Sequence, residues 1–160
     1  MTIQTGDPIP DTPIQAVGSE LQMHQTGELF AGRKALLFGV PGAFTPTCSN
    51  KHLPGYIRQM AEFERRDITV MCLAVNDAYV MQAWAASLQV PPALLMLADG
   101  NGNFTRALGL ELDGSAFGMG LRTRRFALYA EDGLVKLLHL EAPGEFRVST
   151  AEAMLAAIDR

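Results

Sequence analysis

Cys48 is the residue of this sequence best placed to do chemistry. Residues 35–40 form an apolar run that predicts a buried strand, and residues 56–66 have the apolar spacing of a helix. Cys48 therefore lies where a strand gives way to the first turn of a helix. Unpaired N–H groups and the positive end of the helix dipole favour an anion there, and the thiolate is the reactive form of cysteine. The alternative is a buried cysteine that only fills space.

The residues around Cys48 favour the reactive interpretation. Thr45 and Thr47 place hydroxyl groups beside the thiol, while Pro41 and Pro46 stiffen the loop between strand and helix. A packing cysteine needs neither feature. The sequence thus predicts a nucleophilic thiol in a rigid, polar loop.

The motif in this loop resembles that of a known family. Pro41, Thr45 and Cys48 reproduce the Pro-x-x-x-Thr-x-x-Cys pattern of the peroxiredoxins. Residues 41–49 and the His-Leu-Pro-Gly stretch at 52–55 resemble the type-II, or peroxiredoxin-5, group. The resemblance extends from about residue 6 to the last expected helix, through Ala-Val-Asn-Asp at 74–77, Trp84 and Arg-Arg-Phe at 124–126.

This resemblance implies a fold and an activity. The fold would be thioredoxin-like α/β, with a central mixed sheet flanked by helices and an N-terminal hairpin extension. Cys48 would reduce hydrogen peroxide and alkyl hydroperoxides through a sulfenic acid and serve antioxidant defence. Thr45, Arg125 and Pro41 would complete the site, and no metal, haem or flavin would be needed. Glutathione with glutaredoxin, or thioredoxin, would restore the thiol.

Arg125 is the second candidate residue. A charge at the start of an apolar strand is usually a solvated surface group, but the resemblance implies an arginine brought over the thiolate. A guanidinium suits this role because it stays charged and donates several oriented hydrogen bonds. Arg122 and Arg124 are interpreted as surface or loop-tethering residues. We identify no Asn or Asp that would orient His52, so we interpret it as ordering the loop rather than as a hydrolase base.

Cys72 is the other cysteine and a possible resolving residue. It lies in the apolar run 68–75, where a buried thiol is usually inert. A bridge to Cys48 would need Cα atoms within about 7 Å. Some type-II relatives carry a second cysteine at a similar strand, which keeps an internal disulfide open. We nevertheless predict one-cysteine behaviour, with a mixed disulfide between Cys48 and glutathione.

Two other functions stay open at this point. In a non-enzymatic redox sensor or chaperone-like binder, oxidation of Cys48 would change a partner surface, and each chain would react once. A dithiol reductase would need Cys-x-x-Cys at this corner, and Thr45 occupies the first position. Turnover with a thiol separates the peroxidase from the sensor.

Composition bounds the class of protein. A chain of 160 residues suits one domain, 1–160, with a proper core. No apolar stretch is as long as a membrane span, and the first residues lack a signal-peptide pattern. A net charge of −4 argues against nucleic acid as the main partner. Two cysteines are too few for a disulfide scaffold, which favours a reducing, cytoplasmic location.

The remaining chain predicts alternating strands and helices. Type-II relatives imply a homodimer built around the active-site face, with Phe44, Val80 or Met119 near the contact. A glycine-rich loop is expected at 109–120. The other expected elements are a hairpin at 14–17 and 21–24, a helix at 78–88, a strand at 94–98, a short helix ending near 109, strands at 122–130 and 134–140, and a helix at 150–158.

Overall fold

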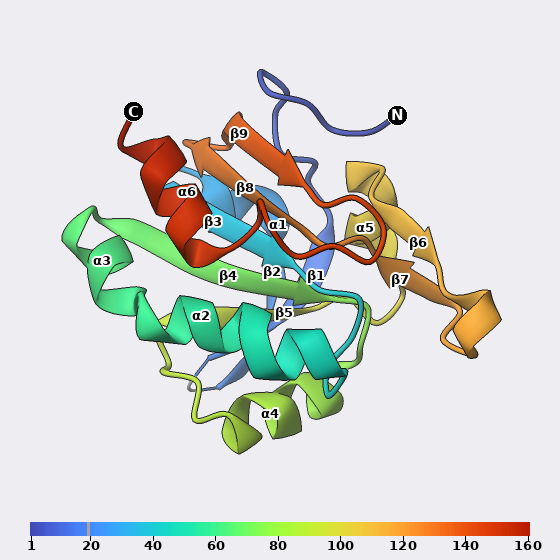
Figure 1. The fold of residues 1–160 in the computed structure, drawn as a ribbon. Coiled ribbons are helices and arrows are strands. Elements are labelled where there is room, and N and C mark those ends of the chain that lie inside the picture. Colours follow the sequence, from blue (N-terminus) through green and yellow to red (C-terminus); the bar gives the residue numbers. More distant parts are fainter. Residues whose placement is uncertain (19) are drawn as a thin grey trace.

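A central sheet lies between two layers of helices in the computed structural model, which describes residues 1–18 and 20–160 (Figure 1). Over these residues the large sheet has seven strands in the order β2-β1-β5-β4-β3-β8-β9, and β6 and β7 pair as a separate two-stranded sheet. The first five strands are β1 (Pro13–Val17), β2 (Leu21–Gln25), β3 (Lys34–Gly39), β4 (Ile68–Ala74) and β5 (Leu94–Ala98). The last four are β6 (Glu111–Asp113), β7 (Leu121–Thr123), β8 (Phe126–Glu131) and β9 (Leu134–Leu140).

The sheet is mixed, as predicted. Strands β3, β4 and β5 are parallel neighbours, whereas β1 runs antiparallel to β5 and β8 antiparallel to β3. The parallel strands are the continuous apolar runs of the sequence, because both of their faces are covered. β1 and β2 form the predicted N-terminal hairpin, and Ser19, between them in the sequence, lies outside the described residues.

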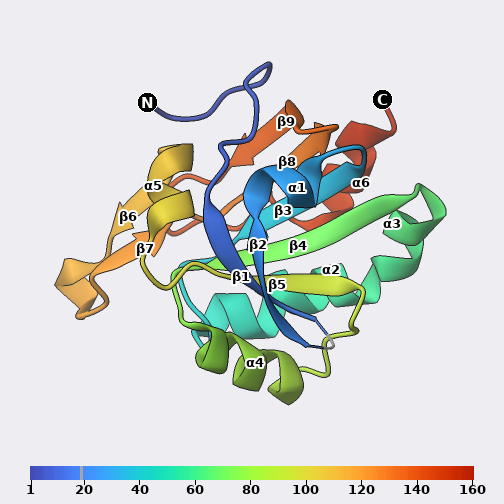
Figure 2. The same cartoon turned by 180° about the vertical axis from the view of Figure 1, so that it is seen from behind.

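Helices cover both faces of the sheet. One face packs against α2 (Leu53–Arg58), α3 (Met60–Arg65), α4 (Ala78–Ser87) and α6 (Ala151–Ile158), and the other against α1 (Thr26–Phe30) and α5 (Asn103–Leu108) (Figures 1 and 2). Alternate residues of β3 serve the two layers: Phe38 faces the first and Leu37 the second, and both are fully buried. Of the helices in the described ranges, none combines the length and apolar character that crossing a bilayer requires.

Most predicted elements are confirmed within one residue at each end: the strands at 35–40, 68–75, 94–98 and 134–140, and the helices at 78–88 and 150–158. Side-chain caps start these two helices. Asp77 accepts a hydrogen bond from Val80 N–H at 2.9 Å, and Thr150 Oγ1 accepts one from Ala153 N–H at 3.0 Å. Gly109 ends α5 in the left-handed conformation at φ +70°.

The prediction of one continuous helix at 56–66 is wrong, because the helical structure starts earlier and is interrupted. Helical structure begins with Pro46 and Thr47, widens into the π-helical turn η1 (Cys48–His52), and continues as α2 and α3, which Gln59 separates. Pro54 explains the wide turn, because it has no N–H to donate and its ring would clash with the carbonyl four residues earlier. The first apolar-spaced residues therefore lie well inside the helix.

The segment 109–130 also differs from the prediction. The expected glycine-rich loop contains β6 and a short 3₁₀ turn, η2 (Ser115–Phe117), and the expected strand at 122–130 is two strands in different sheets. Gly118 and Gly120, at φ +69° and +65°, turn the chain back so that β6 and β7 pair. Arg124 and Arg125 lie between β7 and β8, where the chain crosses from one sheet to the other.

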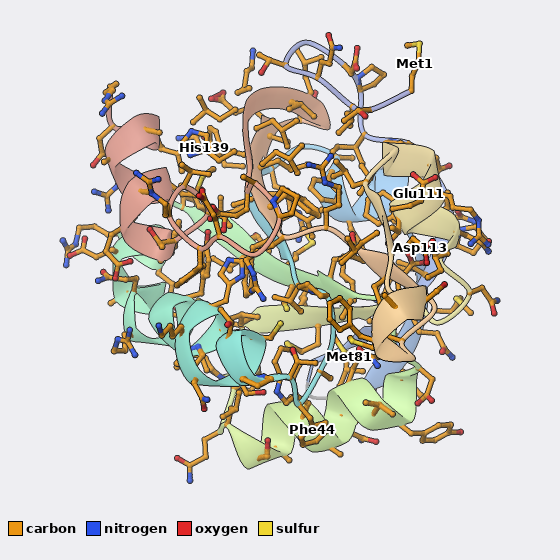
Figure 3. All side chains as sticks on the ribbon, turned by 45° about the vertical axis from the view of Figure 1, so that its right-hand side comes forward. Met1, Phe44, Met81, Glu111, Asp113 and His139 are labelled. Carbon is orange, nitrogen blue, oxygen red and sulfur yellow. The ribbon has the colours of Figure 1, made fainter. Side chains whose placement is uncertain are left out.

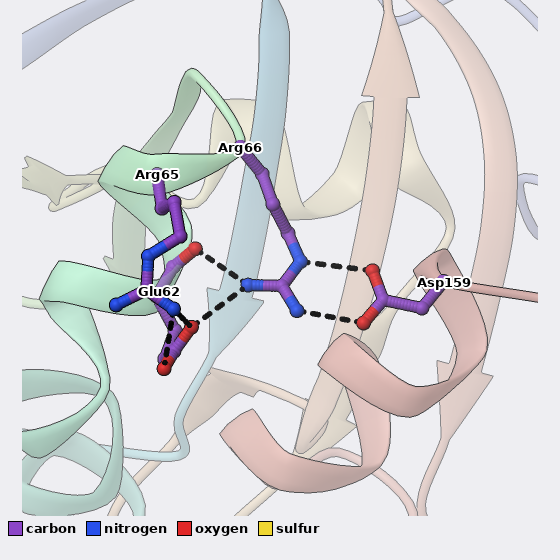
Figure 4. Close-up of polar contacts among 4 residues, drawn as sticks. All are labelled: Glu62, Arg65, Arg66 and Asp159. Carbon is purple, nitrogen blue, oxygen red and sulfur yellow. Dashed lines mark hydrogen bonds and ion pairs between the residues drawn. The ribbon is translucent and has the colours of Figure 1, made fainter.

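An ion-pair network joins α3 to the end of α6 (Figure 4). Arg66 donates to both oxygens of Asp159, at 2.8 and 2.6 Å, and also to Glu62. The planar guanidinium matches the carboxylate in a bidentate pair, which fixes orientation as well as distance. This contact orients α6, whose first residues follow the Ser149 segment described below.

Candidate active site

Cys48 lies in the first helical turn after β3, as predicted. The Thr45 carbonyl accepts the first helical hydrogen bond, from Ser49 N–H at 2.9 Å, so Cys48 lies within the turn that this bond closes. The residue has no exposed surface and belongs to the core layer between the sheet and α2. Its thiol is free. The groups that cover the sulfur of Cys48 therefore control the access of a reactant to it.

Arg125 reaches the sulfur of Cys48. Its Nη2 donates a hydrogen bond to Sγ at 3.1 Å, and its Nη1 donates to His52 Nδ1 at 2.9 Å. The guanidinium also lies over the ring of Phe146, 5.8 Å from the centroid. Over residues 1–18 and 20–160, no carboxylate forms an ion pair with it. A full positive charge thus stays available beside the sulfur.

Thr45 and Pro41 form the loop side of the site. The Thr45 hydroxyl donates to the Gly42 carbonyl at 2.7 Å, which leaves its lone pairs able to accept a hydrogen bond from another group. The Pro41 carbonyl accepts from Arg122 Nη1 at 3.5 Å, and Arg122 Nε also donates to Met119 O at 2.9 Å. Arg122 therefore ties the β6–β7 hairpin to the loop, as its loop-tethering interpretation predicts.

Asn76 fixes the same loop from the opposite side. Its side-chain oxygen accepts a hydrogen bond from Ala43 N–H at 2.9 Å, although the adjacent Asp77 caps α4. Trp84 on α4 donates its indole N–H to Ser49 Oγ at 3.0 Å, next to Cys48. The strand end after β4 and helix α4 thus hold both the loop and the first helical turn in place.

His52 contacts the site more closely than the sequence indicates. The ring is 1% exposed, packs against Phe38, Tyr56 and Phe146, and bonds Ser149 O through Nε2 at 3.0 Å. Burial, and then the charge of Arg125, lower its pKa to about 3, while the Ser149 bond and Glu141 act in the opposite direction. The imidazole is therefore neutral at physiological pH.

Glu141 holds the segment that carries Ser149. Its carboxylate accepts from the backbone N–H groups of Arg147, Val148 and Ser149, at 2.8 to 3.0 Å, and from Ser149 Oγ at 2.6 Å. Burial raises the pKa of this carboxyl, but these hydrogen bonds outweigh it, so the pKa lies below its usual value. A charged carboxylate thus organises the loop between β9 and α6.

Cys72 lies on β4 with its side chain in the same layer as Cys48. It is fully buried, and burial raises the pKa of its thiol, with a smaller contribution from Cys48. Its strand neighbours are Phe38 and Met96. The thiol is therefore enclosed between strands and kept in its protonated, unreactive form.

A cleft of about 600 Å³ opens beside Arg125. Apolar side chains make up much of its wall, and Lys51, Arg124 and Arg125 supply positive charge. The other lining residues include Pro41, Thr47, Leu112, Phe117, Pro143 and Phe146. Among the described residues, no three His, Cys, Asp or Glu side chains are grouped to hold a metal ion. The cleft can admit a small polar molecule with an apolar tail.

The structure brings Cys48, Arg125 and the Thr45 loop together, whereas Cys72 lies buried on β4 and is not part of this group. Sequence reasoning missed the contacts of His52 and Glu141. His52 offered one signal, since it lies four residues after Cys48 on a helix, where both side chains share a face. Glu141 offered none, because most of its partners are backbone N–H groups.

Comparison with known proteins identifies the family. Residues 4–155 match the Redoxin family. Rice (Oryza sativa subsp. japonica) Peroxiredoxin-2E-2, chloroplastic, is 50% identical over 98% of this chain and 73% of that protein. Arabidopsis thaliana Peroxiredoxin-2B is 43% identical over 98% of both chains. The crystal structure of reduced Prx3 from Vibrio vulnificus in complex with H2O2 has a TM-score of 0.91 and 44% identity, over 98% of this chain and 99% of that one. The predicted thioredoxin-like fold is thereby confirmed, and the chain belongs to the Redoxin family as a type-II peroxiredoxin, a thiol-dependent peroxidase.

Proposed function

We propose that Cys48 is the nucleophile that attacks the hydroperoxide. The sulfur anion would bond to the terminal peroxide oxygen, the O–O bond would break, and the leaving oxygen would take a proton to depart as water or an alcohol. Cys48 would be left as the sulfenic acid. The observation that carries this proposal is the 3.1 Å hydrogen bond from Arg125 to Cys48 Sγ.

The neighbouring groups fit the charge changes of this step. Arg125 would hold the anionic sulfur before attack and stabilise the charge that develops along the breaking O–O bond. The Thr45 hydroxyl, whose proton is directed to Gly42, would accept the hydrogen bond of the peroxide O–H. Pro41 would shield the sulfur from water and keep the loop rigid. These roles place the peroxide between the loop and the guanidinium.

We propose that the sulfenic acid is reduced by an external thiol. Cys72 is fully buried and held as the neutral thiol, which supports one-cysteine behaviour. Glutathione would enter the cleft, form a mixed disulfide with Cys48 and release water, and glutaredoxin or thioredoxin would then free the enzyme. Two free cysteines also support a reducing compartment such as the cytoplasm.

A homodimer would bury the apolar side chains exposed near the site. Phe44, Tyr79 and Phe117 are 56%, 77% and 83% exposed, and Figure 3 shows Phe44 beside α4. Phe44 has φ +65°, a conformation that costs a non-glycine residue energy and that presents its ring outward. We propose that this face is the contact between copies of the single 1–160 domain.

Hydroperoxide consumption tests the function directly. Wild type and Cys48→Ser are each assayed with H2O2 and with cumene hydroperoxide, once with glutathione and glutaredoxin and once with thioredoxin. We expect multiple turnovers for wild type and none for Cys48→Ser. Oxidation of wild type once per chain, without turnover by either reductant, would support the sensor instead.

A further inference from the structure

A continuous series of hydrogen bonds runs from the sulfur of Cys48 to a buried carboxylate. It passes through Arg125 to His52 and from there to the carbonyl of Ser149. The carboxylate of Glu141 holds the same Ser149 through its N–H and its hydroxyl. His52 and Glu141 lie behind Arg125 rather than against the sulfur, so any effect on the reaction would pass through Arg125.

The direction of each hydrogen bond at His52 is fixed by its partners. Arginine has no acceptor, so His52 Nδ1 must be the unprotonated nitrogen that accepts from Arg125. The Ser149 carbonyl has no proton, so His52 Nε2–H must donate to it, beside the Tyr56 hydroxyl, which donates to the same oxygen at 2.8 Å. One neutral tautomer satisfies both bonds. The ring thus presents a lone pair, and no proton, to Arg125.

Glu141 lies beside Arg125 but does not pair with its charge. Its backbone N–H donates to the Arg125 carbonyl at 3.1 Å, which extends the β8–β9 ladder by one step. Its carboxylate turns instead to the N–H groups of residues 147–149, and no Glu141–Arg125 ion pair occurs in the described ranges. A direct pair would draw the guanidinium from the sulfur. The carboxylate therefore fixes the loop and leaves Arg125 to Cys48 and His52.

We propose that His52 and Glu141 are positioning residues for the peroxide step. Glu141 fixes Ser149, Ser149 holds His52 in its Nε2–H tautomer, and the Nδ1 lone pair aligns Arg125 on the sulfur of Cys48. This inference rests on the proposed roles of Cys48 and Arg125. Without the alignment, Nη2 still carries charge but loses its fixed direction toward the reacting atoms. The peroxide step slows, whereas reduction of the sulfenic acid by a small thiol does not depend on this geometry.

Two variants of His52 separate alignment from packing. Asparagine places an acceptor oxygen near the position of Nδ1, and glutamine places a donor nitrogen near the position of Nε2. Both are smaller than the ring and disturb its aromatic contacts. We expect His52→Asn to oxidise within about 3-fold of the wild-type rate and His52→Gln about 10-fold or more slowly, a difference set by one hydrogen bond to a charged group.

Glu141 is tested with a matched carboxamide. In Glu141→Gln the amide N–H2 would face backbone N–H groups that need an acceptor, so we expect peroxide oxidation to slow by roughly 5- to 10-fold. Glu152→Gln, on the exposed first turn of α6, is the control, because the one side-chain hydrogen bond of Glu152 within residues 1–18 and 20–160 is a 3.5 Å contact with Gln59. We expect wild-type rates for this control.

Stopped-flow fluorescence of Trp84, the single tryptophan, follows the oxidation, since its N–H bonds the residue next to Cys48. Thiol reduction is followed separately on protein oxidised beforehand with one equivalent of H2O2. Near-ultraviolet circular dichroism checks that each variant is folded. For wild type, ¹⁵N NMR of His52 reads the tautomer without any mutation, and a proton on Nδ1 would overturn the proposal.

The kinetic outcomes are equally decisive. Equal rates for His52→Asn and His52→Gln, or slowing of both half-reactions together, would assign His52 to packing alone. Wild-type oxidation of Glu141→Gln would remove Glu141 from the alignment. Failure of the proposed function gives a different result, because Cys48→Ser would then consume peroxide or wild-type Cys48 would stay reduced.

Discussion

Arg125 Nη2 donates to Cys48 Sγ at 3.1 Å, although 77 residues separate the two in the chain. The contact depends on the place where the chain leaves one sheet for another. Strand β7 ends at Thr123 and β8 begins at Phe126, so Arg125 lies outside both strands. Its backbone is nevertheless fixed, because its carbonyl accepts from Glu141 N–H at 3.1 Å. The guanidinium therefore extends over the start of the helix from a backbone position that is fixed although it lies between two strands.

Removing the guanidinium should slow peroxide attack without unfolding the protein. Arg125→Ala loses a charge-assisted hydrogen bond of about 1.5–3 kcal/mol, so we expect oxidation of Cys48 to slow on the order of 10- to 100-fold. Arg125→Lys should also be impaired, because an ammonium cannot bond sulfur and His52 with a planar fork. Stopped-flow oxidation by H2O2 measures both variants.

Arg106→Ala is the control for this change, since Arg106 lies on α5 and, in the described part of the chain, its side chain donates only to Asn101 O. It should react at the wild-type rate. If Arg125→Ala reacts equally fast, the 3.1 Å contact has no part in the reaction.

Cys72→Ser should keep most of the turnover. The thiol is fully buried on β4 and burial raises its pKa, so it is not poised to attack a sulfenic acid. The hydroxyl must be accommodated in an apolar layer, so we expect a loss of about 1–3 kcal/mol in the free energy of unfolding. Peptide mapping after one equivalent of peroxide, without added thiol, checks the pairing. A stoichiometric Cys48–Cys72 disulfide, with loss of turnover in Cys72→Ser, would make Cys72 the resolving residue.

The parts of the fold that follow from local physics could be predicted from the sequence. Residues 68–75 are apolar without a break, and β4 is buried on both faces. Asp77 and Thr150 cap helices because their oxygens reach N–H groups within one turn. The loop from Pro41 to Cys48 could also be predicted, since the residues that form it lie within a short span of chain.

The rest depends on contacts that no local pattern records. The chain crosses between sheets at residues 124–125, yet no Gly or Pro at 121–131 marks the break in the sequence. Most partners of Glu141 are backbone N–H groups, which every residue except proline offers, so its role leaves little mark in the sequence. His52 accepts from a residue 73 positions away. These features appear only when the tertiary structure brings the partners together.

His52 should stay neutral over the range where most histidines titrate. Burial and Arg125 lower its pKa from 6.5 to about 3, so the folded state binds fewer protons than the unfolded state between these values. Stability therefore falls as the pH drops from about 6.5 toward 3, and the His52 part of that loss is absent in His52→Asn. NMR titration of the ring from pH 8 to 5 checks the first point, and urea unfolding of both proteins checks the second. An apparent pKa near 6.5 would contradict the buried geometry.

Phe44→Asp should convert the proposed dimer into monomers. The ring is 56% exposed and lies on the loop beside α4, so a copy of the chain can cover it (Figure 3). A carboxylate there would need to lose water at the contact, which costs several kcal/mol when no partner charge is present. Light scattering after size-exclusion chromatography gives the mass of each protein. The control is Met23→Asp, because Met23 is another exposed apolar side chain, 66% exposed, and lies on the edge strand β2 rather than on the loop. We expect wild type and Met23→Asp to have twice the mass of the 17.3 kDa chain and Phe44→Asp to have that mass once. A monomeric wild type, or a Phe44→Asp dimer, would exclude this face as the contact.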